Sequence, residues 1–256
     1  MHASHVVFRF YAQLGDLLPP ARRGVAFAHA CTGAASVKDV IESLGVPHTE
    51  VGFIVVDGVP ADFRHLAQPG ERISVYPPFR ALDLAPFPQL VPPLEPEPRF
   101  VLDTHLGTLA RYLRMLGFDT VYSNHATDGD LAATSAHEQR ILLTRDRGLL
   151  KRSVVTHGHL VRSGQPREQL REVTERYSLW SRLHPLQRCL ACNTPLHHVT
   201  RETVQHHLPP RVRARQHEFQ QCPGCQRIYW PGSHHARMLA FITAVHGECV
   251  AAGCPR

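Results

Sequence analysis

The sequence predicts an α/β chain of three parts: a small mixed α/β module, a parallel-sheet α/β domain and a small C-terminal module that contains two cysteine pairs. Three observations support this prediction. A proline-rich segment over residues 77–98 divides the chain. After it, short apolar strand-like runs alternate with helix-like segments, a pattern typical of a parallel sheet covered by helices. Near the C-terminus, two Cys-x-x-Cys pairs are separated by residues 193–221.

The N-terminal module covers residues 1–79. Ser36, followed three residues later by Asp39, predicts a helix start through a near match to a capping box. Apolar runs and alternation predict the strands, and Asp57-Gly58 predicts a tight turn. The predicted elements are a strand over 6–11, a helix over 36–44, and strands over 53–56 and 72–76.

This order of elements resembles the β-grasp, ubiquitin-like fold, and its last strand looks like that of the sulfur-carrier branch. Carriers of that branch act through a free C-terminal Gly-Gly. Here the last strand continues into Pro77-Pro78-Phe79 without a glycine pair, which argues against carrier chemistry. Binding of a protein partner, guiding of RNA and a purely structural role stay open for this module.

A linker is predicted over residues 80–98. Eight prolines fall within 77–98, and neither a helix nor a central strand tolerates that density. We expect a semi-rigid, extended segment.

The α/β domain is predicted over residues 99–185. Apolar residues at helical spacing precede Gly117, which is a favourable residue to end a helix. The predicted strands are 100–103, 119–122, 140–144 and one near 159–161, and the predicted helices are 105–116, 128–138 and 166–177.

Three aspartates of this domain are candidate catalytic metal ligands. Asp103 and Asp146 each follow an apolar strand, and Asp128 begins a helix. In open parallel sheets the reactive crevice lies beyond the carboxyl ends of the strands. Carboxylates gathered there repel one another unless a cation lies among them, and oxygen ligands suit Mg²⁺ or Mn²⁺. The alternative for Asp128 and Asp146 is a role as helix caps only.

Four arginines near these acids have two interpretations. They could form structural ion pairs with the aspartates, or they could hold the phosphate backbone of a nucleic acid. They are Arg111, Arg114, Arg145 and Arg147.

The C-terminal module covers residues 186–256 and contains Cys189, Cys192, Cys222 and Cys225. Four thiolates around a tetrahedral Zn²⁺ form a closed structural site, which orders a segment too small to build its own core. The alternative is four reduced cysteines that only pack. A last helix is predicted over 233–245, with Ser233 as its cap.

Residues 99–240 resemble the PIN-fold ribonuclease family named after the C-terminal domain of the Mut-seven exonuclease. The resemblance is carried by FVLDTHLGTLARYLRMLGFD at 100–119, RILLTRD at 140–146 and CPGCQRIYWPG at 222–232. It implies a PIN-like fold, a metal-dependent RNase site and a zinc ribbon, and many bacterial members carry a β-grasp module in front. By position, Asp103, Asp128 and Asp146 match the family's acids.

One departure from the pattern concerns the number of catalytic metals. Many PIN nucleases have a further acid just after the last one, where this chain has Arg147 and Gly148. Two alternatives follow from this departure. The catalytic site holds one metal ion rather than two, or it has lost nuclease activity.

The distribution of charge favours an anionic partner. The net charge is +6, and the excess lies in residues 99–185 (13 basic, 9 acidic) and 186–256 (8 basic, 3 acidic). Nearly all of the basic residues are arginines, which bind phosphate bidentately and stack on bases. Trp230 could stack on a base, and packing in a small core is equally open for it. His234 could contact phosphate, but surface decoration is the default interpretation of any one histidine in this chain.

These observations predict a metal-dependent ribonuclease whose partner is RNA, including tRNA or another structured RNA. Its cofactors are a structural Zn²⁺ and a catalytic Mg²⁺ or Mn²⁺. The alternatives are a non-catalytic RNA-binding or adaptor protein with a degenerate site, and a sulfur-transfer accessory. No apolar run long enough to span a membrane and no secretory signal is present, so the expected compartment is the cytoplasm, where thiols stay reduced.

Overall fold

The structure is a computed structural model that describes residues 5–31, 34–78 and 89–251. The chain divides into two compact units, one of residues 1–95 with 128–160 and one of residues 96–127 with 161–256. The units cross the domain borders expected from the sequence, because segment 128–160 packs with the N-terminal module. Within the described ranges, no helix is both long and apolar enough to cross a bilayer.

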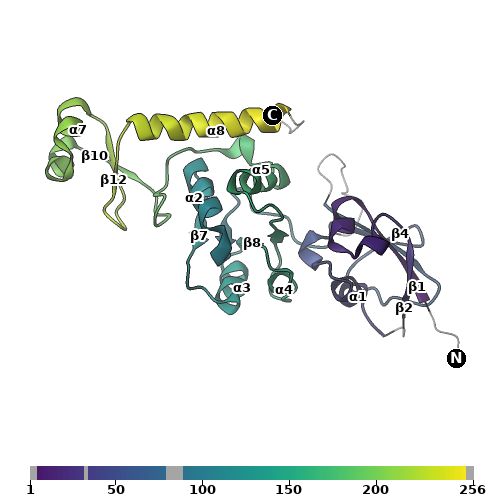
Figure 1. Cartoon of the computed structure of the whole chain (residues 1–256). Helices are drawn as coiled ribbons and strands as arrows, with labels where there is room; N and C mark the ends of the chain where they lie inside the picture. The colour runs from purple at the N-terminus through teal and green to yellow at the C-terminus, as the bar shows by residue number, and fades with distance from the viewer. Residues whose placement is uncertain (1–4, 32–33, 79–88, 252–256) are drawn as a thin grey trace. The chain divides into compact units, whose positions relative to one another are not determined.

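The first unit contains a five-stranded mixed sheet with the strand order β2-β1-β5-β3-β4. Figure 1 labels three of its strands, β1, β2 and β4. β1 is parallel to β5, and the pairs β1–β2, β3–β5 and β3–β4 are antiparallel. The bounds are β1 His5–Phe10, β2 Phe27–Ala30, β3 Phe53–Val56, β4 Val59–Ala61 and β5 Arg72–Tyr76. This topology with one helix confirms the predicted β-grasp fold.

Helix α1 (Val37–Ser43) begins where the capping pattern predicts, since Ser36 Oγ accepts a hydrogen bond from the Asp39 N–H at 3.1 Å. Val37, Val40 and Ile41 bury one side of the helix. The described part of the module also contains three short 3-10 helices: η1 Ala12–Leu17, η2 Pro20–Arg22 and η3 His48–Glu50.

The rest of the first unit is a strand–helix segment that the N-terminal module covers. Strand β8 is fully buried and pairs in parallel with β9, Leu142 opposite Gly158 and Thr144 opposite Leu160. The elements are α3 Asp128–His137, β8 Ile141–Thr144, α4 Arg147–Leu150 and β9 Gly158–Leu160. The predicted strands of this segment are confirmed within a residue or two.

Buried polar groups join this segment to η3. The Glu50 carboxylate is 2% exposed, and its Oε1 accepts from the Leu160 N–H at 2.7 Å and from His159 Nδ1 at 2.9 Å. His48 Nε2 donates to the Val155 carbonyl at 2.8 Å. Because such groups are costly to bury without partners, these bonds fix the module on the segment.

Two basic side chains of the same segment also bond to the N-terminal module. Lys151 Nζ donates to the Glu42 carbonyl at 2.6 Å, and Arg147 Nη1 donates to the Leu17 carbonyl at 2.9 Å.

In the second unit, β6 pairs in parallel with β7, Phe100 opposite Thr120 and Leu102 opposite Tyr122. Helix α2 joins the two strands and ends at Gly117, whose φ of +102° is the left-handed conformation that glycine adopts readily. The elements are β6 Phe100–Leu102, η4 Thr104–Leu106, α2 Gly107–Leu116, β7 Thr120–Tyr122, α5 Pro166–Arg176 and η5 Leu179–Arg182.

The C-terminal module of this unit is an antiparallel ribbon followed by one long helix (Figure 1). The elements are β10 His197–Val199, α6 Arg201–Val204, η6 Gln205–His207, α7 Pro210–Arg215, β11 Phe219–Gln221, β12 Ile228–Tyr229 and α8 Ser233–Ala251. Helix α8 extends past the predicted end at 245. Residues 80–88 of the predicted linker lie outside the described residues. The described part of the linker, 89–98, contains neither helix nor strand.

Candidate metal centre and acidic residues

The first cysteine pair lies in a tight turn. The Cys189 N–H donates to the Thr194 carbonyl, and the Asn193 N–H donates back to the Cys189 carbonyl, both at 2.9 Å. Asn193, directly after the second cysteine, takes a φ of +73°. Asparagine is one of the few non-glycine residues that visit this left-handed region readily.

The second pair repeats this geometry. The Cys222 N–H donates to the Arg227 carbonyl, and the Gln226 N–H donates to the Cys222 carbonyl, both at 2.9 Å. Gln226 takes a φ of +61°. Two turns of the same form therefore present the four sulfurs from two separate parts of the chain.

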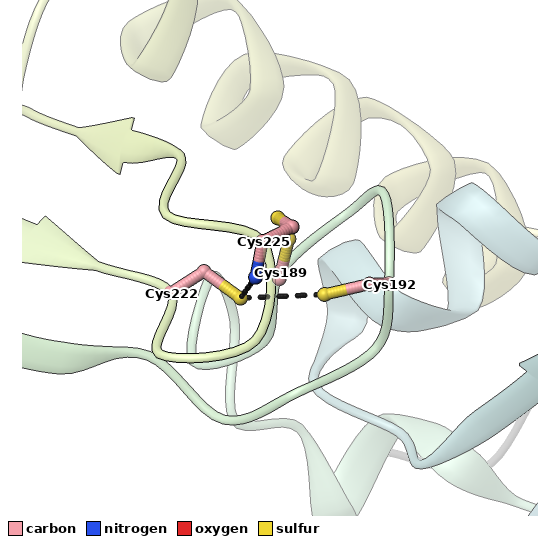
Figure 2. Close-up of side chains that lie close together, drawn as sticks. All are labelled: Cys189, Cys192, Cys222 and Cys225. Carbon is pink, nitrogen blue, oxygen red and sulfur yellow. Dashed lines mark hydrogen bonds between the residues drawn. The ribbon is translucent and has the colours of Figure 1, made fainter.

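The four sulfurs lie within 4.8 Å of one another (Figure 2). Cys189 Sγ is 3.5 Å from Cys225 Sγ, and Cys192 Sγ is 3.3 Å from Cys222 Sγ. A tetrahedral zinc with bonds of about 2.3 Å places its sulfurs about 3.8 Å apart. The donor set is thus the right size and chemistry for zinc, and the structure brings together all four cysteines that the sequence singles out.

Crowding of these thiols changes their proton affinity. Burial raises the pKa of the Cys192 thiol, but hydrogen bonds from Thr194 and from neighbouring thiols outweigh it and lower the pKa to about 6. Burial and neighbouring thiols raise the pKa of Cys225 to about 12. Anionic sulfurs this close together repel one another, and a divalent cation among them would remove the repulsion.

A buried arginine holds the first turn. Arg114 of α2 is 4% exposed, and its Nη1 donates to the Ala191 carbonyl at 2.8 Å and the Leu190 carbonyl at 3.2 Å, while its Nε donates to the Thr120 carbonyl at 2.9 Å. Burial lowers the pKa of this guanidinium. The predicted contact of Arg114 with RNA is therefore replaced by this structural role.

Asn193 fixes the same turn from the other direction. Its Oδ1 accepts from the Thr120 N–H at 2.9 Å, and its Nδ2 donates to Asp119 Oδ1 at 2.8 Å. The start of β7 and the candidate zinc site are thus held together by side-chain hydrogen bonds.

The three candidate catalytic aspartates occupy different surroundings. Asp103 is 8% exposed at the end of β6, and its Oδ1 accepts from the Thr104 N–H at 2.5 Å. Asp146 is exposed and caps α4, where its Oδ1 accepts from the Gly148 N–H at 2.6 Å. Asp128 is exposed and is the first residue of α3.

The capping role considered for Asp146 is therefore present, while Asp128 lies inside the helix start rather than before it. Asp103 belongs to one compact unit and the other two acids to the other unit. Their meeting at one metal ion stays a prediction.

Comparison with known proteins gives the family. The sequence model described as the Mut7-C RNAse domain matches residues 98–242, and the one described as Mut7-C ubiquitin matches residues 3–83. The chain belongs to the Mut7-C RNAse domain family. This confirms the resemblance on which the sequence predictions relied.

Other comparisons add little. Among solved structures, the crystal structure of H. volcanii small archaeal modifier protein 1 matches with 16% identity and a TM-score of 0.24, covering 30% of this chain and 99% of that chain. No curated protein matches the chain.

Some residues around the cysteine cluster of this Mut7-C chain have structural roles that the sequence analysis did not predict. Tyr229 OH lies 3.2 Å from Cys189 Sγ, and burial raises the pKa of this phenol. Asn193 carried a signal, since an asparagine directly after a Cys-x-x-Cys pair suits a left-handed turn. The structural role of Arg114 carried none, because two of its three carbonyl acceptors, Leu190 and Ala191, lie more than seventy residues away in sequence.

Among the remaining predicted RNA contacts, Arg111, Arg145, Arg147 and His234 are exposed, and Trp230 is half-buried. Arg147 also donates to the Leu17 carbonyl.

Proposed function

We propose that this chain is a metal-dependent ribonuclease in which Asp103, Asp128 and Asp146 hold Mg²⁺ or Mn²⁺. The observation that supports it is the position of two acids in a Mut7-C RNAse domain. Asp103 comes directly after β6 and Asp146 two residues after β8, and each of these strands belongs to a parallel pair. Acids at the carboxyl ends of parallel strands are where open α/β sheets place their reactive groups.

In the proposed mechanism Asp103 and Asp146 offer their oxygens to the ion in different ways. Asp103 is nearly buried and is oriented by its bond to the Thr104 N–H, so it offers a fixed oxygen. Asp146 Oδ1 accepts from the Gly148 N–H, so Oδ2 is the oxygen that we assign to the ion. A divalent ion held there would supply a Lewis acid for the phosphodiester. Water would add to phosphorus as the bond to the leaving nucleoside oxygen breaks, and the proton that the water loses would end on that oxygen.

The zinc module has a structural part in this proposal. Four thiolates leave no open position for substrate, so the metal orders the ribbon, and the excess of arginine in residues 186–256 favours RNA over an uncharged partner. We place the reaction in the cytoplasm, where reduced thiols are available for zinc. Structured RNAs, tRNA among them, are the substrates to test first.

A second function, RNA binding without cleavage, is favoured by one specific observation. The positions directly after Asp146 are used structurally, since the Gly148 N–H bonds to that aspartate and Arg147 bonds to Leu17. A further acid that many PIN nucleases have there is absent from this chain. The ubiquitin-like module would then serve to bind a protein partner.

The deciding experiment compares cleavage of single-stranded and structured RNA with Mn²⁺ by the wild type and by Asp103→Asn. We expect a loss of about 100-fold or more, because the ion's contribution is several kcal/mol. Asp62→Asn is the matched control, since Asp62 is an exposed acid that accepts from the Arg64 N–H. Equal cleavage by all three proteins would eliminate the mechanism.

Binding separates the two functions. Tight, salt-sensitive binding of RNA without metal-dependent turnover would favour the non-catalytic protein.

A further inference from the structure

The segment between the two cysteine pairs forms a small helical insert. It contains α6, η6 and α7. Val204, Leu208 and Phe219 are its buried core, and Val212 of α7 and Trp230 pack against them. The insert therefore has its own hydrophobic contact with the ribbon rather than being a loose loop.

Helix α7 presents three arginines to solvent. Arg211, Arg213 and Arg215 are all exposed. In the part of the chain that the structure describes, no carboxylate forms an ion pair with any of them. Three unneutralised guanidiniums within six residues are a favourable surface for phosphate groups.

A pocket of about 290 Å³ lies on the same small core. Phe219, Ile228 and Trp230 belong both to its lining and to the contacts of the insert. Its other walls include Tyr229, His198, His234, His235 and Met238. At this volume, near the lower end for ligand pockets at about 300 Å³, the pocket suits one flat ring system rather than a larger ligand.

We propose that the ribbon and the insert form one binding surface for single-stranded RNA, in which the α7 arginines bind phosphates and the pocket beside Trp230 holds one unpaired base. Aromatic side chains stack on any base, and a basic surface follows the backbone. The histidines around the pocket supply ring N–H donors to base edges or phosphate. A duplex keeps its bases stacked, so it could use only the arginines.

This inference rests on the proposed function, because it takes RNA as the substrate. It goes beyond it by assigning the site that holds the RNA and by predicting a preference for unpaired strands.

The first test measures binding of a fluorescent 12-nucleotide oligouridine, and of a 12-base-pair RNA duplex, by the zinc-loaded chain without added Mg²⁺ or Mn²⁺. Changing Arg211, Arg213 and Arg215 together to Gln should weaken binding of the single strand at least tenfold at low salt. The slope of log K against log salt should fall by about 2, from about 0.7 for each lost phosphate contact on a single strand. A charge-matched control changes Arg9, Arg64 and Arg72, exposed arginines of the ubiquitin-like module, to Gln. Equal effects of the two triple variants would overturn the assignment.

The second test uses tryptophan fluorescence, since Trp180 and Trp230 are the two tryptophans of the chain. Trp180 is 8% exposed and stacks on His246, so stacking of a base should quench Trp230 alone. The quench should persist in Trp180→Phe, disappear in Trp230→Phe and be weaker with the duplex. A quench that Trp230→Phe leaves unchanged, or one as large with the duplex, would overturn the base pocket.

Failure of this inference is distinguishable from failure of the nuclease proposal. If the α7 triple variant binds and cleaves RNA as the wild type does, the insert is not the binding site and the nuclease proposal stands. If the wild type binds a single strand with the expected effects but does not cleave it, the nuclease proposal fails and the surface stands. A wild-type chain that binds no RNA would overturn both.

Discussion

Removing the buried Glu50 carboxylate should open the contact between the ubiquitin-like module and the β8–α4–β9 segment. In Glu50→Ala, the Leu160 N–H and the His159 ring lose a shared acceptor at 2.7 and 2.9 Å. Each unsatisfied buried donor costs about 1–3 kcal/mol, and breaking a buried charged contact from one side costs about 3–5 kcal/mol. We expect the free energy of unfolding of this unit to fall by about 3–5 kcal/mol.

Hydrogen exchange is the sharpest assay because the Leu160 N–H is itself one of the donors. A loss of about 3 kcal/mol corresponds to exchange about 100-fold faster in peptides that contain this amide. Glu50→Gln keeps an acceptor oxygen of the same reach and should lose less. Glu168→Ala is the control, because it removes one partner of an exposed pair with Arg171, and such pairs contribute at most about 1 kcal/mol. Unchanged protection at Leu160 in folded Glu50→Ala would refute the reasoning.

Three further predictions concern the second unit. Metal analysis should find one zinc per chain, and its removal by a strong chelator should speed exchange across the cysteine turns; an unchanged exchange pattern would argue for packed thiols without metal. Gly117→Ala should lower the free energy of unfolding and the urea midpoint markedly, because a Cβ there would lie 2.2 Å from the His184 carbonyl oxygen at a φ of +102°. Gly247 lies in a helix with open space around it, so Gly247→Ala should raise the free energy of unfolding by up to about 1 kcal/mol. A Gly117→Ala protein more stable than Gly247→Ala in urea titrations would contradict this. Asn193→Gly keeps the left-handed turn but removes the bond to the Thr120 N–H, so zinc should dissociate faster in a competition assay, and an unaltered rate would show that the turn needs no support from β7.

The sequence predicts correctly those helices and strands that depend on the local pattern of apolar, capping and turn residues. The strands at 53–56 and 72–76 match to the residue, because apolar runs between turn residues leave few alternatives. β2 and β4 escaped prediction since they lie at the two edges of the sheet and owe their form to a partner strand. β4 even contains Pro60, which only an edge strand tolerates. The insert helices escaped for a similar reason, because each is short and depends on the core around Phe219.

For the sites, spacing was sufficient where the chemistry is local and insufficient where it depends on tertiary contacts. Two Cys-x-x-Cys pairs predicted the sulfur cluster correctly. The interpretation of Arg114 changed because its carbonyl acceptors come from a turn far along the chain. No sequence pattern marked Glu50, since a lone glutamate among polar residues is ordinarily exposed.

The contacts around η3 also bear on how the RNAse domain can be used or inherited alone. A fragment beginning at residue 98, where the family match starts, would leave His159, Lys151 and Val155 facing water without the acceptors and donors that now complete them. Such a fragment should express poorly unless these positions are redesigned. Natural chains that have dispensed with the ubiquitin-like module are accordingly expected to carry other residues there.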